Sequence, residues 1–362
     1  MNGRARSTDQ DTGPKAYEAW TLARDTNPGE NQLDALDTTV IETDTRYGVI
    51  KTYRERDLVS RYLLKYGEWG QLEVEFLAQF VNSNHRVFDL GAFLGTFSLG
   101  LYGLAPFASC VAVEANPVSH SLLCGNLDRH LRTEHQSLRI ALGLPGSVAS
   151  CQAGLRAFVD PENQGSFHFS TPEEERDERF SELFIDVPRL GLKALRDRYG
   201  DYDLLKLDIE GSEFDVLRSD AAWIRKHHPV IWTECNEHVQ SFKLAEFLTW
   251  AGYNVLYFAF PAFNRDNHAK CSRSLHPFAF EAGLLGLHDT VSFGLIEDLE
   301  AKGCFLLEIA NRSDLKRALW LTPRWGMRDW EDRSKWQLGA IMARQLRGEK
   351  FESFLEVEPG NR

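Results

Sequence analysis

The chain has 362 residues, of which 53 are acidic and 41 basic, so its formal net charge is -12. A surface that is negative on average repels a phosphate backbone, which argues against nucleic acid as the main partner. Because 43% of the residues are hydrophobic, the chain can bury a substantial core, and disorder is expected only toward its ends.

The six cysteines form no CxxC pair, which argues against a zinc knuckle or a redox dithiol. Several of them stand in apolar runs, where a free thiol packs as a small hydrophobic group. Residues 1–9 contain no apolar stretch of the kind that a secretory signal has. We therefore expect a reducing, cytoplasmic setting.

One uncharged segment, residues 90–113, is long enough to cross a bilayer, and Gly91 and Gly95 have the spacing of a membrane helix dimer. Its five helix-interrupting residues are Gly91, Gly95, Gly100, Gly103 and Pro106. The segment divides instead into a strand end, a turn, a helix, a loop and a strand, so we expect no membrane span.

The N-terminal part predicts an arm followed by small elements. Residues 1–35 are polar and rich in Asp, Thr, Gly and Pro, which is typical of a loose arm. Two β-branched runs, 39–43 and 48–53, predict a hairpin. Two helices should follow, one over 58–64 with Asp57 as its cap and one over 72–80.

From residue 86 onward, short apolar runs alternate with helical patterns. The expected strands cover residues 86–90, 109–114, 138–142, 202–208, 229–234, 253–259 and 303–309. The expected helices cover residues 96–104, 117–131, 213–217, 239–250 and the tail from about 330. Buried strands alternating with helices predict a doubly wound, parallel sheet. A less regular, partly acidic segment, 145–190, is expected to be a solvated insertion.

Ligands of an open α/β sheet bind beyond the carboxyl ends of its strands. The residues expected at these ends are Asp89 with Gly91, Glu114, Leu142, Asp208 with Glu210, and Glu234. Four of the ends carry a carboxylate. A single carboxylate there often only caps the next helix, but four at one edge indicate a functional site.

The segment Asp89–Gly95 joins a strand to a helix, and its glycines permit a tight turn and close approach of a ligand. Glu114, at the end of the next strand, can accept hydrogen bonds from ribose hydroxyls. A nicotinamide cofactor would use this layout too, but the GxGxxG pattern is missing and Asp89 would face an anionic pyrophosphate. S-adenosylmethionine has no phosphate, and its ammonium and sulfonium groups favour nearby carboxylates, so electrostatics favour it.

Three motifs resemble the FkbM family of S-adenosylmethionine-dependent methyltransferases. They are Asp89-Leu-Gly-Ala-Phe-Leu-Gly95, Glu114-Ala-Asn-Pro117 and Lys206-Leu-Asp-Ile-Glu-Gly-Ser-Glu213. Segments 66–69 and 263–267 are also similar to members of this family, and the resemblance spans roughly residues 47–290. Two positions depart from the family pattern, because Phe93 replaces an asparagine and Ala115 replaces a proline.

The resemblance implies a Rossmann-like, seven-stranded class I methyltransferase sheet over residues 67–310. Residues 1–66 and 311–362 would be an N-terminal extension and a helical C-terminal extension. The implied reaction is methyl transfer from S-adenosylmethionine, usually to a hydroxyl of a sugar, glycan or other natural product.

The candidate site residues fall into four groups. Those expected to hold the cofactor are Asp89, Gly91, Ala92, Gly95, Glu114 and Asn116. Candidate proton acceptors are Asp208, Glu210 and Glu234, with Asp208 favoured because its strand end faces the transferable methyl in this fold. Asn264 and Asn267, in an aromatic loop, are candidate contacts for the acceptor. A Mg²⁺ ion on Asp208, Glu234 and Asn236 is a less favoured addition.

Two residues of the third motif have a purely structural alternative to a functional role. Lys206, inside an apolar strand, is expected to pair its amine with a carboxylate rather than to do chemistry. The structural alternative for Asp208 is that it only orders the turn at Gly211. For the whole chain, the alternatives are a nicotinamide-dependent oxidoreductase and a non-catalytic protein that kept the methyltransferase fold.

Overall fold

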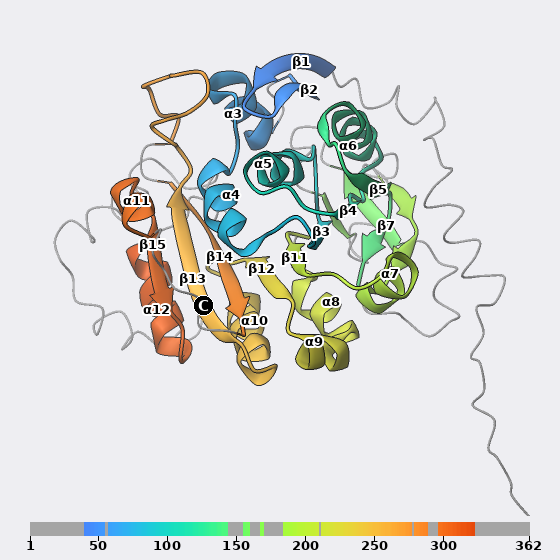
Figure 1. Cartoon of the computed structure of the whole chain (residues 1–362), viewed down its shortest axis with the longest axis vertical. Helices are drawn as coiled ribbons and strands as arrows, with labels where there is room; N and C mark the ends of the chain where they lie inside the picture. Colours follow the sequence, from blue (N-terminus) through green and yellow to red (C-terminus); the bar gives the residue numbers. More distant parts are fainter. Residues whose placement is uncertain are drawn as a thin grey trace, which may run out of the picture.

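The computed structural model shows an α/β domain built on one large sheet (Figure 1). The residues that the structure describes are 40–54, 57–143, 155–159, 167–169, 184–209, 211–276, 279–288 and 296–322. The expected N-terminal arm, most of the acidic insertion, Glu210 and the tail after 322 lie outside these residues. None of the described helices is long and apolar enough to cross a membrane.

The N-terminal elements follow the sequence prediction. β1 (Val40–Thr45) and β2 (Gly48–Tyr53) form an antiparallel hairpin. α3 (Leu58–Tyr66) begins after Asp57, whose carboxylate accepts the backbone amide of Ser60 and caps the helix. The second helix is α4 (Gln71–Leu77), and a 3₁₀ turn, η1 (Ala78–Phe80), continues it.

Eight strands of the described chain form the main sheet, in the order β15-β13-β14-β12-β11-β3-β4-β5. Five adjacent strands are parallel: β5 (Glu134–Leu138), β4 (Ser109–Val113), β3 (Arg86–Leu90), β11 (Leu204–Leu207) and β12 (Val230–Glu234). The chain runs outward from β3 to β5, then returns to β11 beside β3 and runs outward the other way. The switch point of this doubly wound sheet therefore lies between β3 and β11.

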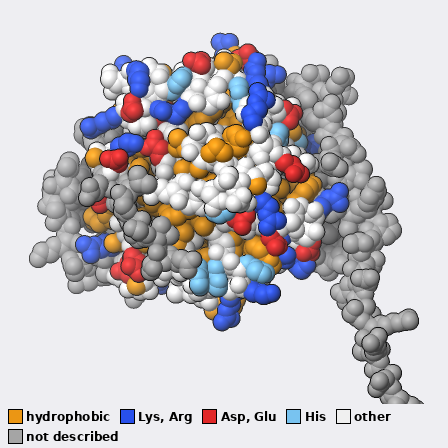
Figure 2. All heavy atoms as spheres, viewed as in Figure 1, with side chains coloured by type: hydrophobic (Ala, Val, Ile, Leu, Met, Phe, Trp, Pro, Cys, Tyr) orange, Lys and Arg blue, Asp and Glu red, His pale blue; other side chains and the backbone are white. Residues whose placement is uncertain are grey.

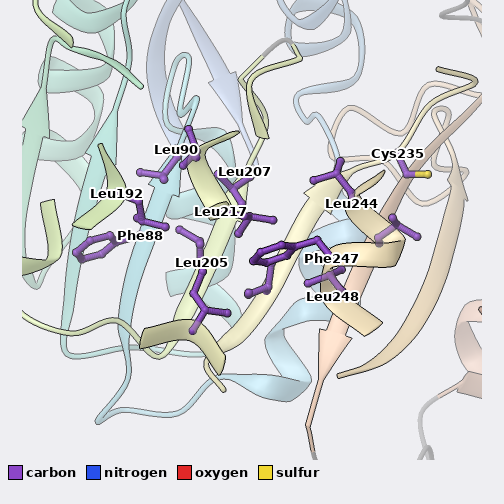
Figure 3. Packing of buried hydrophobic residues seen from close by; sticks show 14 of the residues in the cluster. Phe88, Leu90, Leu192, Leu205, Leu207, Leu217, Cys235, Leu244, Phe247 and Leu248 are labelled. Atoms are coloured by element: carbon purple, nitrogen blue, oxygen red, sulfur yellow. The ribbon is translucent and has the colours of Figure 1, made fainter. Parts of the chain in front are cut away.

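Helices cover both faces of the sheet (Figure 1). α4, α5 (Thr96–Leu104) and α6 (Pro117–His130) pack on one face, where the hairpin also buries its apolar side chains. The other face is covered by α7 (Leu192–Tyr199), α8 (Glu213–Ser219), α9 (Ala221–His227), α10 (Val239–Trp250) and α12 (Arg312–Leu321). Figure 3 shows this second core, to which Phe88 and Leu205 of the sheet and Phe247 of α10 belong.

The far side of the sheet departs from the parallel pattern that we predicted. β13 (Asn254–Pro261) is the expected sixth strand, but β14 (Phe280–Leu287), which the sequence analysis missed, lies between β12 and β13 and is antiparallel to both. β15 (Phe305–Glu308), expected as a seventh strand, is an eighth, antiparallel edge strand. α11 (Ile296–Ala301) precedes it.

The third expected strand, 138–142, was wrong in its bounds. The strand that pairs with β4 is β5, which ends at Leu138, so Leu142 does not end a strand of the main sheet. Residues 141–142 form β6 (Ala141–Leu142) instead, paired with β10 (Arg189–Leu190). Within the insertion, β7 (Leu155–Val159), β8 (Phe167–Phe169) and β9 (Phe184–Val187) form a separate antiparallel sheet.

Candidate functional site

The parallel strands bring the predicted carboxylates to one edge of the sheet. Asp89 is the fourth residue of β3, Glu114 follows β4, Asp208 follows β11 and Glu234 ends β12. These four strands are adjacent in the sheet. The carboxylates therefore flank the switch point, where ligands of open α/β sheets bind.

Gly91 makes the turn after β3 possible. Its φ is +85°, and a Cβ atom there would lie 1.7 Å from the backbone oxygen of Asp208. The amides of Gly91 and Ala92 both donate to the backbone oxygen of Val113 in β4, each at 2.9 Å. Gly95, with φ +86°, precedes α5. The turn thus fits closely between the ends of β4 and β11.

Phe93, the departure from the family motif, adopts a left-handed conformation with φ +47°. Asparagine tolerates this region better than other side chains with a Cβ atom, whereas phenylalanine is strained there. The Phe93 ring is partly buried, and its centroid lies 6.1 Å from that of Tyr53. Its backbone amide still donates to Glu114 Oε2, so the substitution leaves the main chain of the turn in place.

Glu114 joins the glycine turn to the next helix. It is 8% exposed, and its two carboxylate oxygens accept the amides of Phe93 (3.0 Å) and Asn116 (2.7 Å). Burial raises the pKa of Glu114 to about 7, although these amides lower it. Since a carboxylate accepts about four hydrogen bonds, the backbone amides around Glu114 leave acceptor capacity for a ligand. Asn116 caps α6 instead, and its Oδ1 accepts the amides of Val118 and Ser119.

Beside the switch point, Lys206 lies among carboxylates. Its Nζ is 3.4 Å from Asp208 Oδ2 and 3.6 Å from Asp89 Oδ1, which confirms the expectation that its amine is paired. Burial alone would lower the pKa of Lys206, but Asp208, Asp89 and Glu73 raise it above its ordinary value. The lysine is therefore a fixed positive charge inside the site.

Asp89 is fully buried and only half satisfied. Its Oδ2 accepts the hydroxyl of Ser98 at 2.6 Å, whereas its Oδ1 has only the longer ion pair with Lys206 at 3.6 Å. Burial raises the pKa of Asp89, and Lys206 and Ser98 oppose that rise. A buried carboxylate oxygen without a donor is costly, and such an oxygen is suited to receive a donor from a ligand.

Glu73 of α4 belongs to the same cluster, although the sequence analysis did not select it. It accepts a hydrogen bond from Trp232 Nε1 of β12. Burial raises the pKa of Glu73 to about 7; Lys206 and Trp232 lower it, and Asp208 and Asp89 raise it further. No local pattern distinguishes Glu73 from other helix glutamates, because Lys206, Asp208 and Trp232 are more than 130 positions away in the chain.

Glu213, rather than Asp208, orders the turn at Gly211. Its Oε1 accepts the amides of Ile209 and Gly211, each at 3.0 Å. Burial raises the pKa of Glu213, and the negative charge of Glu234 raises it further. Asp208 is left with a side chain that is 43% exposed and paired only with Lys206 among the contacts above.

The loop after β13 packs against the N-terminal elements. Asn264 Nδ2 donates to Glu68 Oε1 at 2.8 Å, and Glu68 also pairs with Arg46 and accepts the amide of His268. Segments 66–69 and 263–267 are thus bound to each other. Asn267 is fully buried, and its amide group bonds to backbone atoms of its own loop. Asn267 therefore orders the loop, and we do not propose it as a contact for the acceptor.

A small concavity lies between this loop and α3–α4. It is lined by aromatic residues and a few polar ones, among them Tyr62, Tyr66, Trp69, Phe260, Glu68 and Asn264. Because β13 runs in the same direction as β12, the loop that follows it lies at the same sheet edge as the four carboxylates.

The part of the chain that the structure describes contains no dedicated set of metal ligands. No group of three or more His, Cys, Asp or Glu side chains there is arranged to hold an ion. Asn236, part of the metal alternative, uses its backbone N–H and C=O to bond Ser241 Oγ.

Residues 103–255 match the Methyltransferase FkbM domain, which confirms the family resemblance that the motifs predicted. The matched range contains Glu114 and Asp208 and begins after the glycine turn. It assigns this part of the chain to a methyltransferase domain. No curated protein matches the chain.

Solved structures with a similar arrangement include three methyltransferases. A precorrin-6y C5,15-methyltransferase from Geobacter metallireducens has 14% identity and a TM-score of 0.35, covering 60% of this chain and 86% of its own. A methyltransferase FkbM from Methylobacillus flagellatus has 16% identity and a TM-score of 0.34, covering 60% of this chain; the match spans 48% of that protein. TYW2 from M. jannaschii, in complex with AdoMet, has 12% identity and a TM-score of 0.33, covering 69% and 84%.

Proposed function

We propose that this protein is an S-adenosylmethionine-dependent methyltransferase. The observation that carries the proposal is the pair Asp89 and Glu114 on either side of the glycine turn. Asp89 Oδ1 is buried and makes only a 3.6 Å ion pair with Lys206, and the Glu114 carboxylate can accept more hydrogen bonds than its backbone amide donors supply. These groups suit the ammonium and the ribose hydroxyls of such a cofactor, and a pyrophosphate beside them would be repelled.

Each residue at this edge of the sheet would then have a separate role in binding. Glu114 would bind the ribose, and Asp89 would receive the ammonium group. The cofactor supplies an activated methyl on a sulfonium. Asp208 and Glu234, at the ends of β11 and β12, are the predicted residues placed to contact the acceptor. Glu210, the third predicted proton acceptor, has no described position. Holding acceptor oxygen, methyl carbon and sulfur in line is the largest contribution that the fold can make.

The cofactor assignment predicts selective binding. By calorimetry, wild-type protein should bind S-adenosylhomocysteine and show no binding of NADH. Asp89→Asn should weaken S-adenosylhomocysteine binding by about 10- to 100-fold, because it removes a charged acceptor for the ammonium. Asp203→Asn, at the opposite end of β11, should leave the affinity unchanged. Binding of NADH alone would establish the oxidoreductase alternative, and an Asp89→Asn variant that is folded and binds normally would overturn this cofactor site.

For the acceptor, we propose a hydroxyl of a sugar, glycan or related natural product. The match to the Methyltransferase FkbM domain supports this class, because the family resemblance implies acceptors of this kind. Protein incubated with methyl-labelled S-adenosylmethionine and a cell extract should transfer the label to a carbohydrate or small-metabolite fraction, as detected by mass spectrometry. Label on protein or nucleic acid would contradict this class. Binding of S-adenosylhomocysteine without any transfer would favour the non-catalytic alternative.

A further inference from the structure

Glu73 reaches the cofactor edge of the sheet from outside the three sequence motifs. It lies on α4, which packs on the sheet face that carries Asp89, Lys206 and Trp232. These three residues are register partners across β3, β11 and β12, so their side chains project from the same face. Glu73 accepts the indole N–H of Trp232 through Oε1. That hydrogen bond fixes the carboxyl group above the strands.

The other oxygen of Glu73 is left open. Among the described residues, no hydrogen bond is made to its Oε2. A Cβ atom on Gly70 would lie 3.0 Å from this oxygen, so the glycine keeps the approach clear. The side chain is partly exposed, which allows a ligand to reach it. Gly70 also lines the aromatic concavity, so Oε2 lies near its wall.

The charges around Glu73 are unbalanced. Lys206 is the cation that acts on Glu73, Asp89 and Asp208, so one positive charge faces three carboxyl groups. Asp89 Oδ1 is fully buried, and its cationic partner is this same Lys206, 3.6 Å away. Both observations point to a missing cationic donor at this place. A sulfonium and an ammonium would supply it.

The orientation of the cofactor follows from Glu114. On the proposed function, on which this inference rests, the ribose lies at Glu114 beside β4. The methionyl end must then extend across the turn toward β11 and β12. Asp208 and Glu73 lie on that side, with Trp232 behind Glu73. A cofactor held in this way would present its methyl group on the side where the open oxygen of Glu73 lies.

We propose that Glu73 is the residue that takes the proton from the acceptor hydroxyl. The hydroxyl proton goes to Glu73 Oε2, and the oxygen lone pair forms the bond to the methyl carbon. The carbon–sulfur bonding pair remains on sulfur, which becomes a neutral thioether. Asp208, favoured from the sequence as the proton acceptor, then orients the reactants beside Lys206. A carboxyl group with a pKa of about 7 is suited to this role at neutral pH.

The test needs no acceptor. Protein labelled with ¹³C at glutamate carboxyl groups is titrated by NMR, alone and with S-adenosylmethionine or S-adenosylhomocysteine. Glu73→Gln and Glu114→Gln identify the two resonances that titrate near 7. A sulfonium close to Glu73 should lower its pKa by about 1 or more, and the neutral thioether should lower it far less. Glu114, facing a ribose common to both ligands, should respond equally to both.

The outcomes separate this inference from the cofactor assignment. If Glu114 responds to both ligands and Glu73 responds to neither, or to both equally, then Glu73 does not face the methyl group and the inference is wrong. If neither ligand binds, the proposed function fails first. Trp232→Phe provides a second readout. It removes the hydrogen bond that favours ionised Glu73, so the pKa of Glu73 should rise, and an unchanged value would contradict the contact.

Discussion

Gly91→Ala should lower the free energy of unfolding by about 3–5 kcal/mol, at the top of the range for single substitutions. Two costs add at this position. The backbone has φ +85°, which residues with a Cβ atom rarely adopt. The new methyl would also lie 1.7 Å from the Asp208 backbone oxygen, and that atom cannot rotate away as a flexible side chain would. Either β3 and β11 separate or the turn unfolds.

Two other glycines provide controls. Gly103, near the end of α5, has no atom within 4 Å of an added Cβ, and Gly103→Ala should stabilise the protein by about 0.5–1 kcal/mol. The free energy of unfolding of Gly95→Ala should lie between those of Gly91→Ala and Gly103→Ala, because its Cβ would meet only the ends of Leu123 and Leu127, each at 3.0 Å. Urea unfolding followed by circular dichroism measures all three. A Gly91→Ala variant no less stable than Gly95→Ala would show that the turn is not tightly confined.

Local pattern predicted the parallel half of the fold well. α5, α10 and β3 have the bounds expected from apolar periodicity and from their flanking turns. The strand-end carboxylates were predictable too, because parallel topology places all carboxyl ends at one edge. Figure 2 shows that acidic and basic side chains are interspersed on the visible face, so a net charge of -12 does not form a continuous acidic field there.

What could not be predicted depends on contacts between distant segments. β14 contains Gly283 and Gly286, which weaken a strand pattern. Gly283 is required because a Cβ atom there would lie 2.2 Å from the Trp232 ring, and the sequence does not reveal that approach. Asn267 looked like a ligand contact because it is polar, but its partners are the turns of its own loop. Glu73 was missed because it lies on α4, whereas Trp232 and Lys206 come from the distant strands β12 and β11.

The mixed charge on the visible face concerns the surface only, whereas the charges that decide the balance of the site lie around the buried Asp89 and Lys206. Four ionisable groups, Glu73, Asp89, Lys206 and Asp208, meet at the switch point. Their balance cannot be read from composition, since a single lysine determines whether the carboxylates beside it are compensated. The stability of the site should therefore depend on Lys206 more than on any surface ion pair.

Lys206→Met should destabilise the protein by about 3–5 kcal/mol at neutral pH, because it leaves Asp89 without the cation that compensates it. Methionine preserves most of the buried stem, so the loss is mainly electrostatic. Lys193→Met is a matched control, because Lys193 pairs with Asp197 on an exposed helix face and should cost less than about 1 kcal/mol. Thermal and urea unfolding measure both.

The pH dependence of Lys206→Met identifies the cause. The pKa values of Asp89 and Glu73 are raised in the folded protein, from 3.8 for Asp89 and from 4.5 to about 7 for Glu73. A raised carboxyl pKa gives stability that is complete below the unfolded pKa and is lost as pH rises through the folded pKa. Removing Lys206 raises both folded values further. The difference from wild type should therefore be smallest near pH 4 and grow toward pH 8, and Asp89→Asn added to Lys206→Met should recover part of it. A difference independent of pH would mean that Lys206 acts through packing alone.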